Sequence, residues 1–532
     1  MSAIAAVPIN DLKTQKYDRQ LRLWASTGQT ALENAKICLL NATATGCEVL
    51  KNLVLPGVGN ATVIDDAIVN DTDLRGNFFL DASSIGRSRA ECTAALLAEL
   101  NEDASVTSMH KSPTELIHNQ PELFDNFTMI IATNLHEKDM LALSDLCDHS
   151  KITLIAVSSK GLCGVFRIQA PEHPVIDTHP ENAVDLRLGC PFTELLDYVD
   201  TIDLDQLDQT DHGHVPFVVI LLKYVNEWKQ QHDNQPPASY SERNQLKECI
   251  RKGMRTVDEE NFEEALANVW RLATTNTITS NVRNIFEDQS CENLSAQSNA
   301  FWIVARAIKD FVSNEGHGQL PLSGKLPDMK SDTPRYMALQ NIYRQKALSD
   351  LEAVKSRVRN LLREIDVPED TVPDKMIDDF CKNAAHIQLL RYRTLRDEYV
   401  TAPSKDTIAN TIQMDENMYY YLIFRAAERF FDKHGRYPGA QGGTNSTDVS
   451  LLEQETRSLM EELGLAIEES DSFKKAANNF VRFADQETAN IAALMGGLIA
   501  QEAIKMITSQ YIPINNTCIF NGIASTSSVC EL

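Results

Sequence analysis

A doubly wound α/β fold interrupted by a large, mostly helical insertion is predicted by three features of the sequence. The N-terminal third alternates short apolar runs with helix-period segments, which is typical of parallel strands joined by crossover helices. From about Pro171 apolar residues recur at three- and four-residue spacing, and strand-like character returns near Ile519. We therefore expect residues 1–170 and 481–532 to form one domain around an insertion at residues 171–480.

The first strand and the loop behind it carry the clearest pattern. An apolar run from Lys36 to Leu40 precedes Asn41-Ala42-Thr43-Ala44-Thr45-Gly46, an amphipathic helix, and a strand ending at Asp65. This is the frame of a Rossmann-like dinucleotide-binding unit. A GxGxxG loop would place glycine at 41, 43 and 46, and Gly46 alone is present. Because Thr43 puts a side chain where a phosphate would approach the backbone, we expect no bound nucleotide.

The remaining elements follow from periodicity. Buried strands are expected at 129–132 and 152–157, and a last strand near 519–520. Helices of the insertion are expected at 217–228, 262–272 and 301–312, followed by a longer one through 351–362. Near the end, Gly496 and Gly497 lie inside an apolar helical pattern. Glycine destabilises a helix interior unless packing requires it, so we expect this helix to press against another backbone.

Composition limits the partners. The 532 residues include 75 acidic and 50 basic side chains, for a net charge of −25. This charge repels nucleic acid and anionic membranes, so we expect neither as a partner and favour a basic protein. The N-terminus lacks a signal pattern, and the eleven cysteines are scattered without a C-x-x-C pair. We expect an intracellular protein with reduced thiols and no structural metal site.

Several motifs at both ends of the chain resemble one family. They are Tyr17-Asp18-Arg19-Gln20-Leu21, Gly57-Val58-Gly59 before a strand, Ile85-Gly86, and the glycine pair leading to Ala500-Gln501-Glu502-Ala503-Ile504-Lys505. Together they resemble the enzymes that activate ubiquitin-like proteins, which share a ThiF/MoeB-like adenylation fold with bacterial sulfur-carrier activators. The resemblance extends over essentially the whole chain, and it implies that fold for the N- and C-terminal segments.

The residues that serve catalysis in active members of that family are altered here. Ala67 stands where the second acid of an Asp-x-Asp pair is expected, and Gly76 replaces an arginine. Arg89 replaces a lysine, and Asn134 stands where an aspartate would hold magnesium. The resemblance therefore implies a degenerate domain that binds no cofactor or metal itself. ATP and magnesium are expected in a partner subunit, and this chain is not expected to be active alone.

Two further roles are implied by the resemblance. Arg19 is expected to act in trans, as an arginine finger directed at the ATP held by the partner subunit. The partner interface is expected to include five residues of one helical stretch: Arg335, Tyr336, Leu339, Gln340 and Tyr343. The alternative for that stretch is an ordinary helix packed within its own domain. Cys190 precedes Pro191, but the thioester-forming cysteine is expected on the partner subunit.

The resemblance implies a non-catalytic regulatory subunit of a heterodimer that activates a Nedd-type ubiquitin-like modifier. The complex would adenylate the modifier's C-terminus and transfer it to a cysteine of the catalytic subunit, as the first step of cullin neddylation. A conjugating enzyme would bind through the complex, and the expected location is the cytoplasm, with the nucleus as a second site. Three alternatives stay open: the equivalent subunit of a sumoylation-activating heterodimer, a pure adaptor, and a self-sufficient adenylating enzyme.

Overall fold

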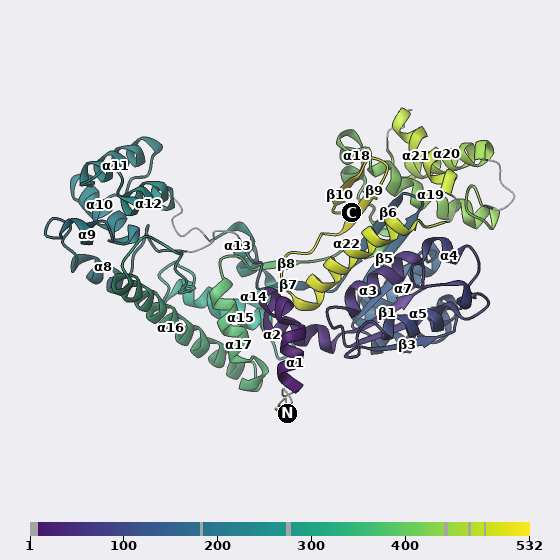
Figure 1. Ribbon diagram of the computed structural model, residues 1–532, viewed down its shortest axis with the longest axis horizontal. Coiled ribbons are helices and arrows are strands. Elements are labelled where there is room, and N and C mark those ends of the chain that lie inside the picture. The colour runs from purple at the N-terminus through teal and green to yellow at the C-terminus, as the bar shows by residue number, and fades with distance from the viewer. Residues whose placement is uncertain (1–8, 181–184, 273–277, 441–444, 466–469, 484–485) are drawn as a thin grey trace, which may run out of the picture. The chain divides into compact units, whose positions relative to one another are not determined.

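The computed structural model describes residues 9–180, 185–272, 278–440, 445–465, 470–483 and 486–532 (Figure 1). The chain forms two compact units. One contains Met1–His173 together with Leu390–Leu532, and the other contains Pro174–Leu389. The return to the first unit thus falls at Leu390, well before the expected residue 481. The sequence predicts a mostly helical insertion up to residue 480, but this pattern could not indicate which core the part after Leu390 packs against.

The first unit is built on an eight-stranded sheet in the order β10-β9-β6-β5-β4-β1-β2-β3. Strands β1 to β5 are parallel neighbours in the order 3-2-1-4-5, as in a doubly wound nucleotide-binding fold, and β6, β9 and β10 extend the sheet with antiparallel pairing. The strands are β1 (Lys36–Leu40), β2 (Asn60–Ile64), β3 (Ser105–Met109), β4 (Met129–Thr133), β5 (Thr153–Lys160), β6 (Cys163–Gln169), β9 (Thr517–Asn521) and β10 (Thr526–Cys530). The expected strands are therefore present as β1, β2, β4 and β5, and the last one, near residue 519, is β9.

Both faces of the sheet are buried, which explains the continuous apolar runs of its central strands. In β1, Ile37 and Leu39 join the core beneath α3 (Ala44–Val54) and α22 (Ala489–Thr508). Cys38 and Leu40 join the core beneath α6 (Pro113–Asn119) and α7 (Glu137–Ser150) on the other face. β1 is in register with β2 from Lys36 onward and pairs with β4 on its other side. The strand order reverses between β1 and β4, and folds of this kind bind their ligands at that point.

Helices of the first unit come from both ends of the chain. They are α1 (Ile9–Lys16), α2 (Asp18–Asn34), α3 (Ala44–Val54), α4 (Asp73–Gly76), η1 (Ala82–Ser84), α5 (Arg89–Ala98), α6 (Pro113–Asn119), η2 (Pro121–Asn126), α7 (Glu137–Ser150), η5 (Asp397–Thr401), α18 (Lys405–Met414), α19 (Met418–His434), α20 (Asn445–Glu462), α21 (Asp471–Phe483) and α22 (Ala489–Thr508). Helix α19 packs on β6 and β9, and residues of α18, α20 and α21 share its hydrophobic core, so these helices cover the antiparallel part of the sheet.

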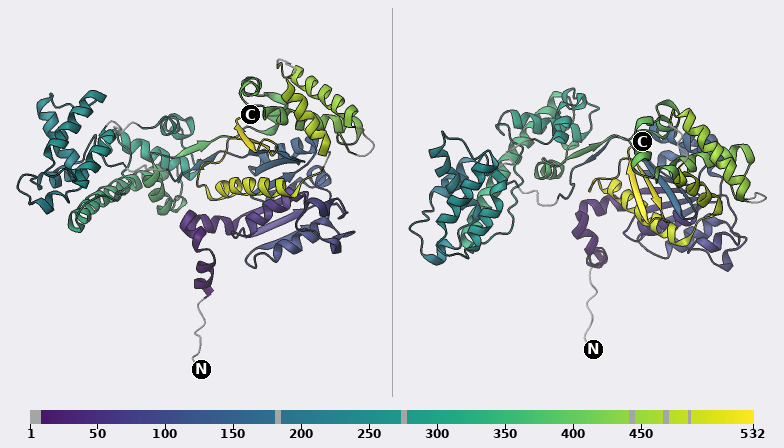
Figure 2. Two further views of the ribbon diagram at one scale, coloured as in Figure 1. Left: turned by 45° about the horizontal axis from the view of Figure 1, so that its top comes forward. Right: turned by 90° about the horizontal axis from the view of Figure 1, so that it is seen from above.

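Helix α22 packs along α3, and Figure 2 shows it in yellow beside the purple N-terminal elements. A Cβ on Gly496 would lie 2.5 Å from Glu48 Cβ, so the expected close packing is confirmed at this glycine. Gly497 faces open space instead. By length and composition alone α22 could cross a membrane. Its buried face, including Met495 and Ile499, belongs to the core of the first unit.

The second unit is helical, as the 3.6-residue periodicity predicts. Its elements are α8 (Thr193–Asp200), α9 (Gln209–His212), α10 (Phe217–Gln231), α11 (Tyr240–Gly253), α12 (Glu260–Asn268), η3 (Val269–Leu272), α13 (Ser280–Glu287), α14 (Gln289–Glu292), α15 (Ala300–Ser313), α16 (Thr333–Glu364), η4 (Glu369–Thr371) and α17 (Asp374–Asn383). A two-stranded sheet of β7 (His173–Val175) and β8 (Gln388–Leu390) lies where the chain passes between the units. The long helix α16 contributes to both hydrophobic cores of the second unit.

Candidate functional site: a rebuilt nucleotide-binding loop

The loop after β1, residues 41–43, stands where a dinucleotide-binding turn would lie but carries different residues, and we call it the rebuilt loop. Asn41 takes a left-handed conformation with φ of 65°, which asparagine tolerates better than most residues. Its side-chain amide donates to Thr133 O at 2.9 Å, across the switch point. Gly46 is retained because a Cβ there would lie 2.9 Å from Leu39 Cδ1. Only the glycine needed for packing helix against strand therefore survives.

The two threonines of the site bond to each other and to the loop. Thr43 Oγ1 donates to Thr133 Oγ1 at 3.1 Å, and Thr133 Oγ1 donates to Asn41 O at 2.6 Å. Thr43 also caps α3, because its Oγ1 accepts the Gly46 N–H at 3.2 Å. The side chain expected to obstruct a phosphate thus satisfies one of the amides that a phosphate would use.

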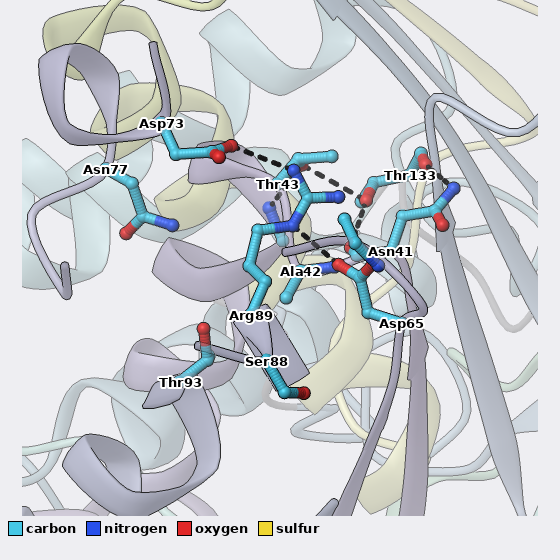
Figure 3. A network of polar contacts seen from close by, with 12 residues as sticks. Asn41, Ala42, Thr43, Asp65, Asp73, Asn77, Ser88, Arg89, Thr93 and Thr133 are labelled. Atoms are coloured by element: carbon cyan, nitrogen blue, oxygen red, sulfur yellow. Dashed lines mark hydrogen bonds and ion pairs between the residues drawn. The ribbon is translucent and has the colours of Figure 1, made fainter. Parts of the chain in front are cut away.

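Arg89 forms ion pairs with two carboxylates of the site. It begins α5, where Ser88 caps the helix, and its guanidinium lies between Asp65 and Asp73 (Figure 3). The Nε donates to Asp65 at 2.7 Å and Nη1 donates to Asp73 at 2.9 Å. Burial alone would lower the pKa of Arg89, but the two carboxylates outweigh it and raise the pKa. Its positive charge is therefore neutralised within the chain instead of being free for a phosphate.

Asn134, another altered position, also forms hydrogen bonds within the chain. Asn134 Oδ1 accepts the Ser159 N–H at 3.0 Å, and its Nδ2 donates to Glu487 at 3.4 Å. Glu487 was not expected from the sequence, since its local context of Gln and Thr is ordinary. Arg75, beside the glycine that replaces the family arginine, is exposed to solvent.

Within the described residues no cluster of three or more His, Cys, Asp or Glu could hold a metal ion.

The Tyr-Asp-Arg-Gln motif is anchored by its tyrosine. Tyr17 is 2% exposed, and its hydroxyl donates to Asp103 at 2.9 Å and accepts from Asn101 Nδ2 at 3.0 Å. A Cβ on Gly57, whose φ is +101°, would lie 3.1 Å from Tyr17 Cζ. The glycine-rich turn before β2 therefore packs against the start of α2. This contact holds the helix turn that carries Arg19 in place.

The two arginines of α2 differ in their surroundings. Arg22 forms an ion pair with Asp18 at 2.8 Å, one turn earlier. Arg19 is exposed, and in the part of the chain that the structure describes it has no hydrogen bond or ion pair to another residue. The helix then bends at Trp24 and Ala25. Arg19 is thus available to a partner, and Arg22 is a matched neighbour that is already paired.

The five expected interface residues occupy the first turns of α16 but divide into two groups. Leu339 and Tyr343 are fully buried in the core of their own unit, and the Tyr343 hydroxyl donates to Leu186 O at 2.5 Å. For these two side chains the structure agrees with the alternative of a helix packed within its own domain. Gln340 is exposed, whereas Arg335 and Tyr336 are half-buried. An interface role for Arg335, Tyr336 and Gln340 stays a prediction.

The buried cysteines are poorly suited to covalent catalysis. Cys190 and Cys249 are exposed, and most of the others are buried. Burial raises the pKa of the Cys47 thiol to about 12, and it likewise raises that of Cys163 to about 12. A thiol with so high a pKa carries little thiolate at neutral pH and is a poor nucleophile.

The sheet order and the altered switch-point loop define a Rossmann-like adenylation fold, and the ThiF family model matches residues 17–532. A NEDD8-activating enzyme E1 regulatory subunit of Gallus gallus is 42% identical over 530 residues, covering 98% of each chain. The corresponding protein of Danio rerio is 40% identical, covering 98% of this chain and 99% of that one. The regulatory subunit AXR1 of Arabidopsis thaliana is 40% identical, covering 97% of this chain and 96% of that one. The chain belongs to the ThiF family and, within it, to the family of NEDD8-activating enzyme E1 regulatory subunits.

Proposed function

We propose that the chain is the regulatory subunit of a heterodimeric enzyme that activates the ubiquitin-like protein NEDD8. The observation that carries this proposal is identity of about 40% over nearly the whole chain with proteins of that name. A sumoylation-type subunit is disfavoured by the same match. A self-sufficient adenylating enzyme is disfavoured by the engagement of Arg89 with Asp65 and Asp73.

The proposed roles of the two subunits follow from the surroundings of Arg89, which is paired with two carboxylates, and of Arg19, which is exposed. ATP and magnesium bind in the catalytic subunit, which adenylates the modifier's C-terminal carboxylate and then receives it on a cysteine. This chain contributes Arg19. Its guanidinium is exposed and pairs with no residue that the structure describes, and it would help to neutralise the triphosphate charge as pyrophosphate leaves. A conjugating enzyme would reach the modifier through the assembled complex. We propose the cytoplasm, with the nucleus as a second site, as the place where the complex acts.

An ATP–pyrophosphate exchange assay tests the proposal. The purified chain alone should show no modifier-dependent exchange, and exchange should appear when the catalytic subunit is added. The chain should also co-purify from its native cell with a second subunit that carries an intact glycine loop. Strong exchange by the chain alone would contradict the regulatory role. Stable pairing with a sumoylation-type catalytic subunit, but not with a NEDD8-type one, would contradict the choice of modifier.

A further inference from the structure

Residues 486–488, which we call the strap, cross the carboxyl edge of the sheet beside the rebuilt loop. Two hydrogen bonds fix the strap to the turn after β5. Gly161 N donates to Gln486 O at 2.7 Å, and Thr488 Oγ1 donates to Gly161 O at 2.9 Å. A parallel bridge between Gly161 and Glu487 accompanies them. The strap is therefore a fixed part of the sheet edge where doubly wound folds bind their ligands.

The side chain of Glu487 reaches the first turn of α3. Its Oε2 accepts the Thr45 N–H at 3.2 Å, and its Oε1 accepts from Asn134 Nδ2 at 3.4 Å. The free amides at the start of this helix are the groups that hold a phosphate in a dinucleotide-binding fold. Here the chain supplies both acceptors, since Thr43 Oγ1 takes the Gly46 amide. The carboxylate thus occupies an anion position at this helix start.

The backbone around the strap is shaped to admit it. A Cβ on Gly76 would lie 2.7 Å from Glu487 O, and a Cβ on Gly161 would lie 2.4 Å from Phe483 Cγ. Neither neighbour could move without displacing the strap or the end of α21. Gly76 stands where the family resemblance led us to expect an arginine. The replacement therefore removes a phosphate-binding charge and also makes room for Glu487.

Groups around the carboxylate offset part of the effect of its burial. Burial raises the pKa of Glu487, and hydrogen bonds from Thr45 together with the charge of Lys160 oppose this rise. The helix start adds a favourable partial positive charge. Lys160 is itself buried, at the end of β5. A negative charge at this position is therefore stabilised by the start of α3 and by Lys160 of β5.

We propose that Glu487 is an internal substitute for phosphate, and that the strap excludes nucleotides by occupying the start of α3. The lost glycines and the missing acid would then be consequences of a site already filled by the chain. The inference concerns this chain's own loop, so it stands whether or not the chain pairs with a modifier-activating partner. Removing the carboxylate should free the Thr45 amide at the start of α3 for a small oxyanion.

Two measurements on the full chain without a partner test this proposal. In Glu487→Ala, amide hydrogen exchange at Thr45 should become about tenfold faster or more, because its hydrogen bond to a charged acceptor is lost. Inorganic phosphate should then raise the melting temperature of Glu487→Ala more than sodium chloride of equal ionic strength does. Glu487→Gln retains an acceptor oxygen but loses the charge, so it should accelerate exchange at Thr45 less than Glu487→Ala does.

Gly76→Ala tests the strap by a separate route. Its added Cβ should push against Glu487 O and accelerate exchange at Thr45, whereas Gly497→Ala, which faces open space, should leave that exchange unchanged. This variant keeps the test decisive if Glu487→Ala fails to fold. The proposal is contradicted if phosphate stabilises the wild type as much as Glu487→Ala, or if neither variant changes exchange at Thr45. It is equally contradicted if exchange accelerates in Glu487→Ala without any response to phosphate.

Discussion

The Arg89 Nε donates to Asp65 Oδ2 at 2.7 Å, and the same oxygen accepts the Ala42 N–H of the rebuilt loop at 2.7 Å. The carboxylate after β2 therefore joins α5 to the loop after β1. In a dinucleotide-binding fold an acidic residue at this point binds the ribose of the ligand. Here the same geometry has become a structural contact, and the site contributes to the stability of the first unit.

Replacing Arg89 tests that conversion. Asp65 is fully buried, so Arg89→Ala would leave its charge without its main partner and should lower the free energy of unfolding by about 3 kcal/mol or more. Arg22→Ala removes an ion pair whose side chains are 78% and 50% exposed, and it should cost about 1 kcal/mol or less. Urea denaturation measures both values. Equal effects of the two substitutions would show that the Arg89 network adds little stability.

The turn before β2 offers a test of packing. A Cβ on Gly59 would lie 1.8 Å from Glu33 O, a contact that only a backbone shift can relieve. Gly59→Ala should therefore destabilise the chain by about 1–3 kcal/mol, measured by thermal unfolding. Gly497→Ala faces open space within α22 and should stabilise by about 0.5–1 kcal/mol. A tolerated Gly59→Ala would mean that the α2–β2 contact is looser than the structure has it.

Thiol reactivity should follow exposure. Cys190 and Cys249 are exposed, whereas burial raises the pKa of Cys291 and of Cys381 to about 12 each. Brief alkylation of the native chain, read by peptide mass spectrometry, should label the two exposed thiols first. Denaturation should then make all eleven available. Rapid labelling of Cys291 or Cys381 in the folded chain would contradict the packing of the second unit.

His173 should make stability depend on pH. It is buried, its Nε2 has no hydrogen-bond partner in the described part of the chain, and burial lowers its pKa from 6.5 to about 4. Because the unfolded chain binds the proton more readily, this residue favours folding fully above pH 6.5, and its contribution is lost as the pH falls toward 4. The slope should reach at most about 1.4 kcal/mol per pH unit.

The variant His173→Phe isolates that effect. It keeps an aromatic ring of similar size but cannot bind a proton, so its unfolding free energy should fall less steeply than that of the wild type between pH 6.5 and 4. Denaturant titrations at several pH values give the difference directly. Parallel pH profiles for the two proteins would mean that His173 reaches a proton acceptor or solvent when folded.

The strands of the parallel sheet could be predicted because burial on both faces leaves continuous apolar runs, as in β1 and β4. The edge strand β3, Ser105–Met109, carries polar residues on its exposed side and gave no such signal. The lost glycines of the loop were also readable. The role of Glu487 was not, because 442 residues separate it from Thr45 and no local pattern links them.

Helix α16 shows a second limit of the sequence. Apolar and aromatic residues at helical spacing suit a protein interface and a core equally well, and Leu339 and Tyr343 belong to the core of the second unit. The stretch after residue 390 was likewise expected to be part of a mostly helical insertion, with no indication that its helix α19 packs on β6 and β9. In both cases helical character was predictable, and the surface against which the helix packs was not.

The central claim, that this chain acts on ATP chemistry only through Arg19 in its partner's site, is tested most directly by one comparison. ATP–pyrophosphate exchange should be measured for the reconstituted pair containing Arg19→Ala or the matched control Arg22→Ala. Arg19→Ala should lower the exchange rate about tenfold or more while the two chains still co-elute, because a charge that stabilises the departing pyrophosphate is lost. Arg22→Ala, already paired with Asp18, should leave the rate nearly unchanged. An unchanged rate with Arg19→Ala, or an equal loss with both variants, would contradict the account.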